Sequence, residues 1–467
     1  MTISAEVVRQ EVSELHRLIQ PLVKLCTERR PDFPTYNDTS REFFMHIGEL
    51  GRRSLTYLQT LPTKILNQKY SQIAASNRQK LLQLKSDWEN LHQYIQPALD
   101  ADTLHLPTPL IAALHERLHE IGKWRAHRFT LFHASEVNYF EVPSGIVRRV
   151  ANGIASQVGG KPFPKFLGLI GIPYSQANGL FLNCALAHEM GHFIFQENEA
   201  QPVQEKVDDA LERMLTDLGV SLDEEQIPFC RDLINSWVEE TFCDLFATCL
   251  IGPAYSFSFS QLVMASMLIG QRDGEPADFY RFEWEHPAEV ARFYSHRKML
   301  ERLGWWAEIQ DWSSAPVEVL RICDKPTSSF FTVEVGGQLP QTILQDRLLQ
   351  CYNEVCDWLV NHLPSRVKGS AKDVAEFKMQ SPIISDYLRR AIVPSTIIAE
   401  GRVEHPRPVV LINAGFQFWL ENLPLLLTNI KGEPRNSIES RSRIGARLEL
   451  WLLKALEDYP LLTKGDS

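Results

Sequence analysis

The stretch ALAHEMGHFIF, residues Ala185 to Phe195, constrains both the fold and the chemistry of this chain more than any other. It contains the pattern His188-Glu189-x-x-His192 among uncharged neighbours, which predicts a buried helix. Residues four apart on a helix share a face, so both imidazoles can bind one metal ion. The glutamate between them can take a proton from water and return it to a leaving amine. The stretch therefore predicts a catalytic zinc site with Glu189 as the general base.

A second copy of the five-residue pattern occurs in AALHERLHEIG, residues Ala112 to Gly122, but it lacks the features of a metal site. Arg117 lies inside the pattern, and the apolar stripe of this helix places His115 and His119 toward its polar flank. We expect the solvated face of an amphipathic helix here. The first copy instead carries Gly191, a poor helix residue that lets another backbone or a substrate approach closely.

A third metal ligand is expected in the downstream stretch SWVEETFCDLFA, residues 236–247. Catalytic zinc takes three protein ligands and leaves one position open. Glu240 is the expected ligand, and Asp244, one helical turn later, is expected to accept a hydrogen bond from a ligand imidazole and fix its tautomer. Glu239 is either an ordinary surface acid or the alternative ligand. Cys184 is expected to be a buried thiol rather than a ligand.

The composition of the 467-residue chain is that of an ordinary globular protein, and its net charge of −10 argues against nucleic acid as a partner. Eight cysteines without a C-x-x-C pair favour reduced thiols, and the first residues lack the apolar core of a signal peptide, so we expect a cytoplasmic location. Residues 245–270 carry no charge, but Gly252-Pro253 interrupts them. This favours two buried helices over a membrane span, with peripheral membrane association as a further hypothesis.

The expected fold class is mainly helical with a small β-sheet, divided into three segments. Residues 1–128 show helical spacing of apolar residues and are expected to form a helical N-terminal domain. Residues 129–311 contain the HEMGH stretch and are expected to form the metal-binding domain. Residues 312–467 are expected to form a helical C-terminal domain.

Four shorter stretches add detail to this division. Residues 129–143 and 161–175 are rich in aromatic and β-branched residues between Pro and Gly, which predicts strands. Residues 312–319 have the composition of a linker, and residues 406–420 are a candidate short strand.

The spacing of His188-Glu189-x-x-His192 followed by Glu240-x-x-x-Asp244 resembles that of the gluzincin metallopeptidases, over roughly residues 160–300. Two branches of these peptidases are similar. One contains the HtpX-like and CAAX-protease-like peptidases, which are membrane proteins. The other contains the soluble ImmA/IrrE-like peptidases.

The first branch has a further element, a His-Pro pair with an arginine six residues after the histidine. His286-Pro287 and Arg292 match this element, while Glu285 stands where the family usually has Ser or Thr.

This resemblance implies a zincin-like domain in which zinc is held by the two histidines of HEMGH and by Glu240. It also implies that residues 165–175 form an edge strand, to which an extended peptide substrate adds by main-chain hydrogen bonds. His286, Arg292, Tyr255 or Tyr294 would stabilise the oxyanion of the reaction. The plainer alternatives are that His286-Pro287 caps a loop, that Arg292 pairs with a neighbouring acid and that Tyr255 belongs to the core.

Together these features predict a zinc-dependent endopeptidase that hydrolyses a peptide bond in a protein substrate through a metal-activated water, with regulated and narrow specificity. The helical flanking segments are expected to bind a regulatory protein or to gate the cleft. The alternative is a non-catalytic zinc-binding scaffold or sensor with a degenerate peptidase domain. Retention of Glu189 argues against that alternative, because a purely structural zinc site does not need this carboxylate.

Overall fold

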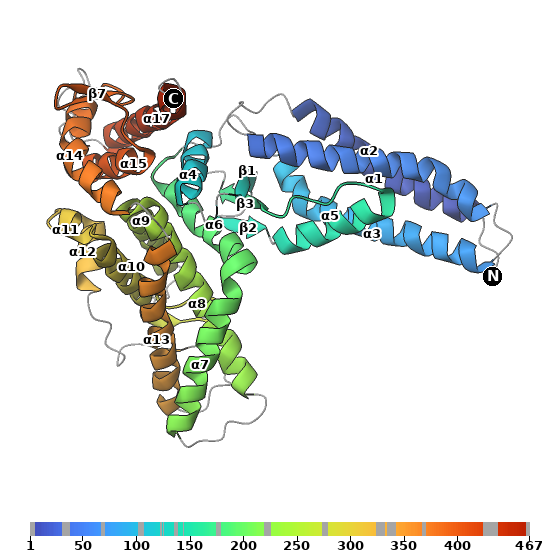
Figure 1. Ribbon diagram of the computed structural model, residues 1–467, viewed down its shortest axis with the longest axis horizontal. Coiled ribbons are helices and arrows are strands. Elements are labelled where there is room, and N and C mark those ends of the chain that lie inside the picture. The colour runs from blue at the N-terminus through green and yellow to red at the C-terminus, as the bar shows by residue number, and fades with distance from the viewer. Residues whose placement is uncertain are drawn as a thin grey trace. The chain divides into compact units, whose positions relative to one another are not determined.

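The computed structural model describes residues 5–29, 38–66, 71–100, 107–121, 124, 126–134, 139–142, 144–173, 179–218, 226–272, 279–323, 332–333, 342–366, 370–423 and 438–463. It is mainly helical, with small sheets of two or three strands, as expected (Figure 1). The chain divides into two compact units. The first comprises residues 1–108 and 126–177, and the second comprises residues 109–125 and 178–467.

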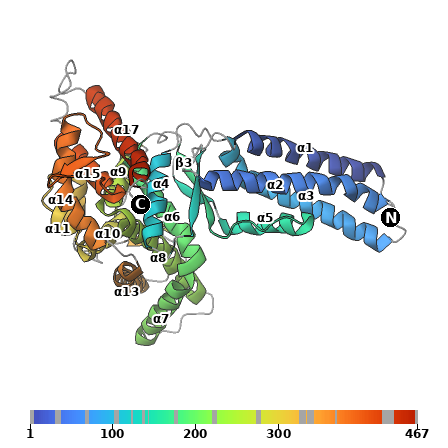
Figure 2. The ribbon, with the colours of Figure 1, turned by 45° about the horizontal axis from the view of Figure 1, so that its top comes forward.

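The first unit combines long helices with a three-stranded sheet (Figure 2). Helices α1, α2 and α3 pack along one another, and α5 packs against α2 and α3. Their core contains apolar residues at helical spacing, such as Leu84, Trp88 and Leu91 of α3. The elements are α1 (Ala5–Arg29), α2 (Asp38–Leu66), α3 (Ser71–Asp100), β1 (Arg128–Ala134), β2 (Phe140–Val142), α5 (Ser144–Val158) and β3 (Leu167–Pro173).

The strand order of this sheet is β1-β3-β2, which makes β3 the central strand. Strand β1 pairs with β3 in parallel over its full length, and β2 pairs antiparallel with residues 169–171. The strands predicted at 129–143 and 161–175 are therefore confirmed. The prediction that 165–175 forms an edge strand is wrong, because β3 is paired on both sides and residues 169–171 have no free edge for a substrate strand.

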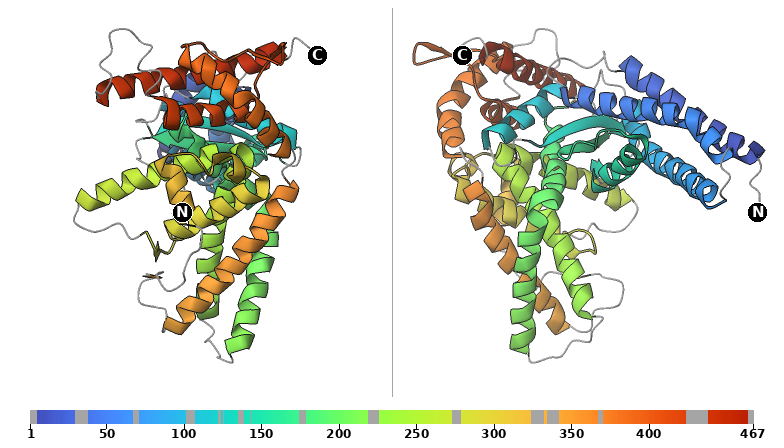
Figure 3. Two further views of the ribbon diagram at one scale, coloured as in Figure 1. Left: turned by 90° about the vertical axis from the view of Figure 1, so that its left-hand side faces the viewer. Right: turned by 45° about the vertical axis from the view of Figure 1, so that its right-hand side comes forward.

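The second unit is built around α8, a long helix that is buried through most of its length. Helices α6, α7, α10 and α13 pack against it, and Figure 3 shows α7 and α13 beside it. The elements are α4 (Thr108–Ile121), η3 (Leu182–Ala185), α6 (Leu186–Ile194), the π-helix η4 (Phe195–Glu199), α7 (Ala200–Leu218), α8 (Gln226–Ile251), α9 (Pro253–Arg272), β4 (Arg281–Phe282), α10 (Glu289–Leu303), α11 (Trp306–Ile309), α12 (Ala315–Ile322), β5 (Thr332–Val333), α13 (Thr342–Arg366), α14 (Ser370–Arg389), β6 (Ile397–Ala399), β7 (Arg402–Glu404), α15 (Pro408–Gln417), the π-helix η6 (Phe418–Asn422) and α17 (Ile438–Thr463).

These two units do not follow the three segments expected from the sequence. The strands of 129–173 belong with the N-terminal helices, whereas α4 and the C-terminal helices belong with α6. The predicted linker at 312–319 is instead part of the second unit, since Trp312, Pro316 and Val317 are buried there.

The short strand predicted at 406–420 is wrong. These residues form α15 and η6, and the helix α15 begins at Pro408. All of its residues from Pro408 to Phe416 are buried, which explains the error. A run that is apolar on every face has no periodicity to distinguish a helix from a buried strand.

The uncharged residues 245–270 form the end of α8 and most of α9, so the two helices predicted here are confirmed. Gly252 separates the two helices with a left-handed φ of 66°, a conformation that glycine adopts without strain. Within the described parts of the chain, no helix has both the length and the apolar character needed to cross a membrane.

The second His-Glu-x-x-His copy lies on α4, and its arginine is not on a solvated face as expected. Arg117 is only 3% exposed. It pairs with Asp373 of α14 and with Glu120, and it donates to the carbonyl of Leu250. Arg407 also pairs with Asp373 and Glu120. The copy therefore carries a buried ion-pair cluster that ties α4 to α14, and its His119 is exposed.

Replacing Asp373 by Ala is expected to lower the free energy of unfolding by about 3 kcal/mol, because Arg117 would lose its buried partner. Denaturant unfolding of the variant measures this. The control is Asp386→Ala on the same helix, which removes more exposed pairs with Arg389 and Arg390 and should cost less than about 1 kcal/mol. Equal stability of the two variants would contradict a structural role for the α4 cluster.

Candidate metal centre

Helix α6 lies unusually close to α8 at Gly191. A Cβ atom at this position would lie 2.8 Å from Cα of Cys243, closer than real side chains approach. The close backbone expected beside Gly191 is therefore α8. This contact sets the HEMGH histidines directly opposite the acidic residues of α8.

The chain that enters α6 is held by the C-terminal helix α17. The backbone N–H groups of Leu180 and Phe181 both donate to the carboxylate of Glu449. An acid at this place satisfies N–H groups at the start of the helical segment, which have no partner within it. This fixes the position of the segment from which His188 and His192 project.

Both histidines are oriented by carboxylates on α8. Nδ1 of His188 lies 2.9 Å from Oδ1 of Asp244, and Nδ1 of His192 lies 3.1 Å from Oε1 of Glu239. A carboxylate accepts a hydrogen bond, so each Nδ1 carries a proton, and each Nε2 offers a lone pair to a metal ion when the ring is neutral. The role predicted for Asp244 therefore has matching geometry. Glu239 orients His192 in the same way. This role differs from the two considered for Glu239, an ordinary surface acid and the alternative metal ligand.

The Nε2 atoms of both histidines face the carboxylate of Glu240. The Nε2 atoms of His188 and His192 are 3.2 Å apart. The carboxylate of Glu240 lies 3.4 Å from the first and 3.3 Å from the second. In tetrahedral zinc with bonds of 2.0–2.1 Å, ligand atoms are about 3.3 Å apart. The two histidines and Glu240 therefore fit a zinc ion.

Cys243 offers a further potential metal ligand close to the two histidines, and the sequence pattern did not reveal it. Its sulfur and the nitrogens of His188 and His192 all lie within 4.8 Å of one another. Burial raises the pKa of the Cys243 thiol well above its usual value, and the carboxylate of Glu240 adds to this. Glu240 is the better third ligand, because it is ionised and each of its oxygens lies at the spacing of zinc ligands from one nitrogen, Oε2 from His188 and Oε1 from His192.

The ionisable groups of the cluster shift one another's pKa values. Burial alone would lower the pKa of His188, but its hydrogen bonds to Asp244 and Glu240 outweigh burial and raise it to about 10. Burial opposes ionisation of Glu240 as well, yet His188, His286 and Arg292 hold its pKa well below the usual range. His188 therefore stays protonated beyond neutral pH, and a zinc ion that binds it must displace that proton.

Glu189 differs from the other acids of the site because nothing holds it. It is 9% exposed, and it has no hydrogen-bond or ion-pair partner among the described residues. A buried carboxylate without a partner is costly unless the site uses it. This observation agrees with the role of general base predicted for Glu189.

Asp244 is the centre of the buried polar network behind His188. Arg292 donates to both of its oxygens, at 2.7 and 2.8 Å, and the hydroxyl of Tyr255 donates to Oδ1. Arg292 also lies 3.5 Å from Glu240. Arg292 therefore pairs with neighbouring acids, and Tyr255 is a buried residue of the network, as the plainer alternatives stated. Oxyanion stabilisation by Arg292 stays a prediction.

His286 lies at the site, whereas the described contact of Tyr294 is with Lys298. Nδ1 of His286 lies 3.4 Å from Oε2 of Glu240, and the side chain is 54% exposed, so it can meet a substrate. Tyr294 instead stacks under Lys298. His296, which lies 3.3 Å from Asp244, was missed. Its spacing of four residues after Arg292 is the one signal that could have revealed it.

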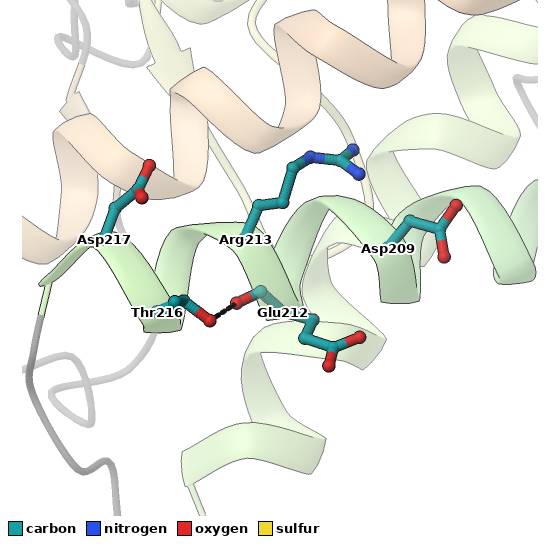
Figure 4. Close-up of a pocket in the computed structure, with 5 residues that line it drawn as sticks. All are labelled: Asp209, Glu212, Arg213, Thr216 and Asp217. Atoms are coloured by element: carbon teal, nitrogen blue, oxygen red, sulfur yellow. Dashed lines mark hydrogen bonds between the residues drawn. The ribbon is translucent and has the colours of Figure 1, made fainter.

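A separate surface hollow lies on α7 and has no part in this centre. Figure 4 shows its five lining side chains, which all project from that helix: Asp209, Glu212, Arg213, Thr216 and Asp217. Arg213 pairs with Glu354 of α13, and the Thr216 hydroxyl donates to the carbonyl of Glu212. The Arg213–Glu354 pair is exposed, as expected of an ordinary helix surface.

The chain matches no family model, no curated protein and no solved structure.

Proposed function

We propose that this protein is a zinc-dependent endopeptidase, with the zinc held by His188, His192 and Glu240. The observation that carries the proposal is the convergence of two imidazole lone pairs and a carboxylate at spacings of 3.2 to 3.4 Å. The resemblance of the HEMGH and Glu240-x-x-x-Asp244 spacing to the gluzincins supports the same chemistry.

Each residue of the chain has a distinct task in this proposal. Bound zinc would polarise the scissile carbonyl and lower the pKa of water at the site. Glu189, free of partners, takes the proton of the attacking water and passes it to the leaving amine. Asp244 and Glu239 hold the Nδ1 protons of the histidines, so that the Nε2 atoms stay available for the metal. The half-exposed His286 is the candidate donor to the oxyanion.

The wider setting follows from the rest of the chain. All eight cysteines are buried free thiols, which supports a reducing compartment such as the cytoplasm. The helical parts outside the centre make up most of the chain, and we propose that they bind a regulatory protein or restrict access to few substrates.

The second candidate is a structural zinc site, and Cys243 is the observation that favours it. If both Glu240 and Cys243 were ligands, four protein groups would close the coordination sphere and leave no place for water. The protein would then be a zinc-binding scaffold or sensor. Cobalt can be bound in place of zinc, and cobalt sites absorb visible light. A sulfur-to-cobalt charge-transfer band in the spectrum of the cobalt-loaded protein would support this candidate.

The test of the proposal is zinc content, measured by elemental mass spectrometry on the purified chain. We expect about one zinc per chain, as in other catalytic sites of this type. His188→Ala and Glu240→Ala should lose it. The double variant of His115 and His119 to Ala is the matched control, since it removes the histidines of the second copy and should keep the zinc. Wild-type protein that holds no zinc and takes up none when it is added would overturn the proposal.

A further inference from the structure

His296 is a fully buried histidine that the proposed reaction does not use. It lies on α10 with 0% exposure, among the rings of Tyr255, Phe259 and Phe293, whose centroids are 5.1 to 5.8 Å away. Neither ring nitrogen has an aligned hydrogen-bond partner. A buried polar group in this state costs about 1–3 kcal/mol. An aromatic residue would fill the same space without that cost, so the nitrogen requires an explanation.

The ring of His296 lies beside the carboxylate of Asp244. Nε2 of His296 lies 3.3 Å from Oδ2 of Asp244, close enough for a small rotation of the ring to align a hydrogen bond. Arg292, one turn earlier on the same face of α10, donates to the same oxygen from Nε. Helix α10 therefore presents two potential donors to Asp244 from one side.

The other oxygen of Asp244, Oδ1, faces the candidate metal centre. Oδ1 faces Nδ1 of His188 and accepts from Tyr255 and from Nη2 of Arg292. A carboxylate rotates about its Cβ–Cγ bond unless both oxygens are held. The orientation of the His188 ring depends on the position of Oδ1, because Oδ1 accepts the hydrogen bond from Nδ1 of that ring. A donor on Oδ2 thus restrains His188 from a distance.

We infer that His296 is a positioning residue, whose Nε2–H donates to Oδ2 of Asp244 and so holds the carboxylate that orients His188. Burial lowers the pKa of His296, although Asp244 opposes this, so the ring that donates is neutral. The inference rests on the proposed zinc site, because it concerns how one of its ligands is held. It adds a further layer to the centre, from His296 through Asp244 to His188.

The first test is the tautomer of His296 in the wild-type protein, read from the ¹⁵N chemical shifts of labelled histidine. The His296→Gln variant identifies the signal by its loss. We expect a neutral ring with the proton on Nε2. A proton on Nδ1 instead would aim the Nε2 lone pair at the carboxylate and would overturn the inference.

The second test compares two replacements of similar size, His296→Gln and His296→Met. The Gln amide can still donate to Asp244, and the Met side chain cannot. We expect zinc affinity, measured by competition with a chromophoric chelator, to fall about 10-fold in the Met variant and to be restored toward wild type by Gln. The visible spectrum of the cobalt-loaded protein should shift in the Met variant only.

Phe293→Leu is the control for packing, because it disturbs the same aromatic surroundings and leaves the nitrogen in place. Equal effects of Gln, Met and this control would mean that His296 is a packing residue, and the inference would fall. Wild-type protein that binds neither zinc nor cobalt would instead overturn the proposed function, so the two failures are distinguishable.

Discussion

Replacing Glu189 by Gln is expected to leave zinc bound and to lower peptide hydrolysis by about 10²–10⁴-fold, the usual contribution of a general base. The amide keeps the shape and polarity of the side chain but cannot take a proton at neutral pH. Zinc is retained because Glu189 is not within the group of ligand atoms formed by His188, His192 and Glu240. Hydrolysis is measured with a degenerate peptide library and mass spectrometry, since the substrate is unidentified.

The second His-Glu-x-x-His copy supplies the matched control for this experiment. Glu116→Gln makes the same change at the same position of the pattern, on a helix that serves a buried ion-pair cluster instead of a metal. It should leave both zinc and hydrolysis unchanged. If the Glu189 variant cleaved the library as fast as wild type, the peptidase proposal would fail even with zinc present.

The sequence predicted the centre of the site because its parts are local or lie on one helix. The spacing of His188 and His192 places them on one face of α6, and Glu240 and Asp244 share one face of α8. The pairing of these two helices followed from the need of catalytic zinc for a third protein ligand, and the resemblance agreed with it. The role of Gly191 followed similarly, since a helix residue without a side chain implies a close neighbour.

The residues that the sequence did not reveal depend on contacts between distant segments. Arg117 was expected on a solvated face because its buried partner, Asp373, follows 256 residues later. Cys243 and His296 carry no spacing signal relative to the HEMGH helix. The central position of β3 could not be predicted, because it depends on the short strand β2, whose three residues pair antiparallel to it.

Replacing Asp244 by Asn is expected to have the largest effect on the whole centre. Both oxygens of Asp244 face only donors, from His188, Tyr255, Arg292 and His296, so an amide nitrogen in place of either oxygen opposes a donor. Arg292, which is 9% exposed, would also lose the charge that compensates its own. Breaking a buried pair in this way costs about 3–5 kcal/mol of stability. Zinc affinity should fall about 10–100-fold, because His188 loses the group that orients it.

The pH dependence of this loss separates it from a surface effect. Burial would raise the pKa of Asp244, but Arg292 outweighs burial and holds the pKa well below its usual range. A carboxyl group with a lowered pKa stabilises the fold above its unfolded pKa of about 3.9 and loses this stabilisation as the pH falls through the folded value. The difference in unfolding free energy between wild type and Asp244→Asn, measured without metal, should therefore be largest at about pH 5 to pH 6. It should shrink above the unfolded His pKa of about 6.5, because Asp244 also helps to raise the pKa of His188 to about 10.

A double variant distinguishes the two roles of Asp244, which are compensation of Arg292 and orientation of His188. Combining Asp244→Asn with Arg292→Met removes the uncompensated charge, so unfolding in the presence of a chelator should show recovery of part of the lost stability. Zinc affinity should stay low, since no carboxylate then faces Nδ1 of His188. Recovery of both quantities together would mean that Asp244 serves only to neutralise Arg292, and that His188 needs no orienting partner to bind zinc.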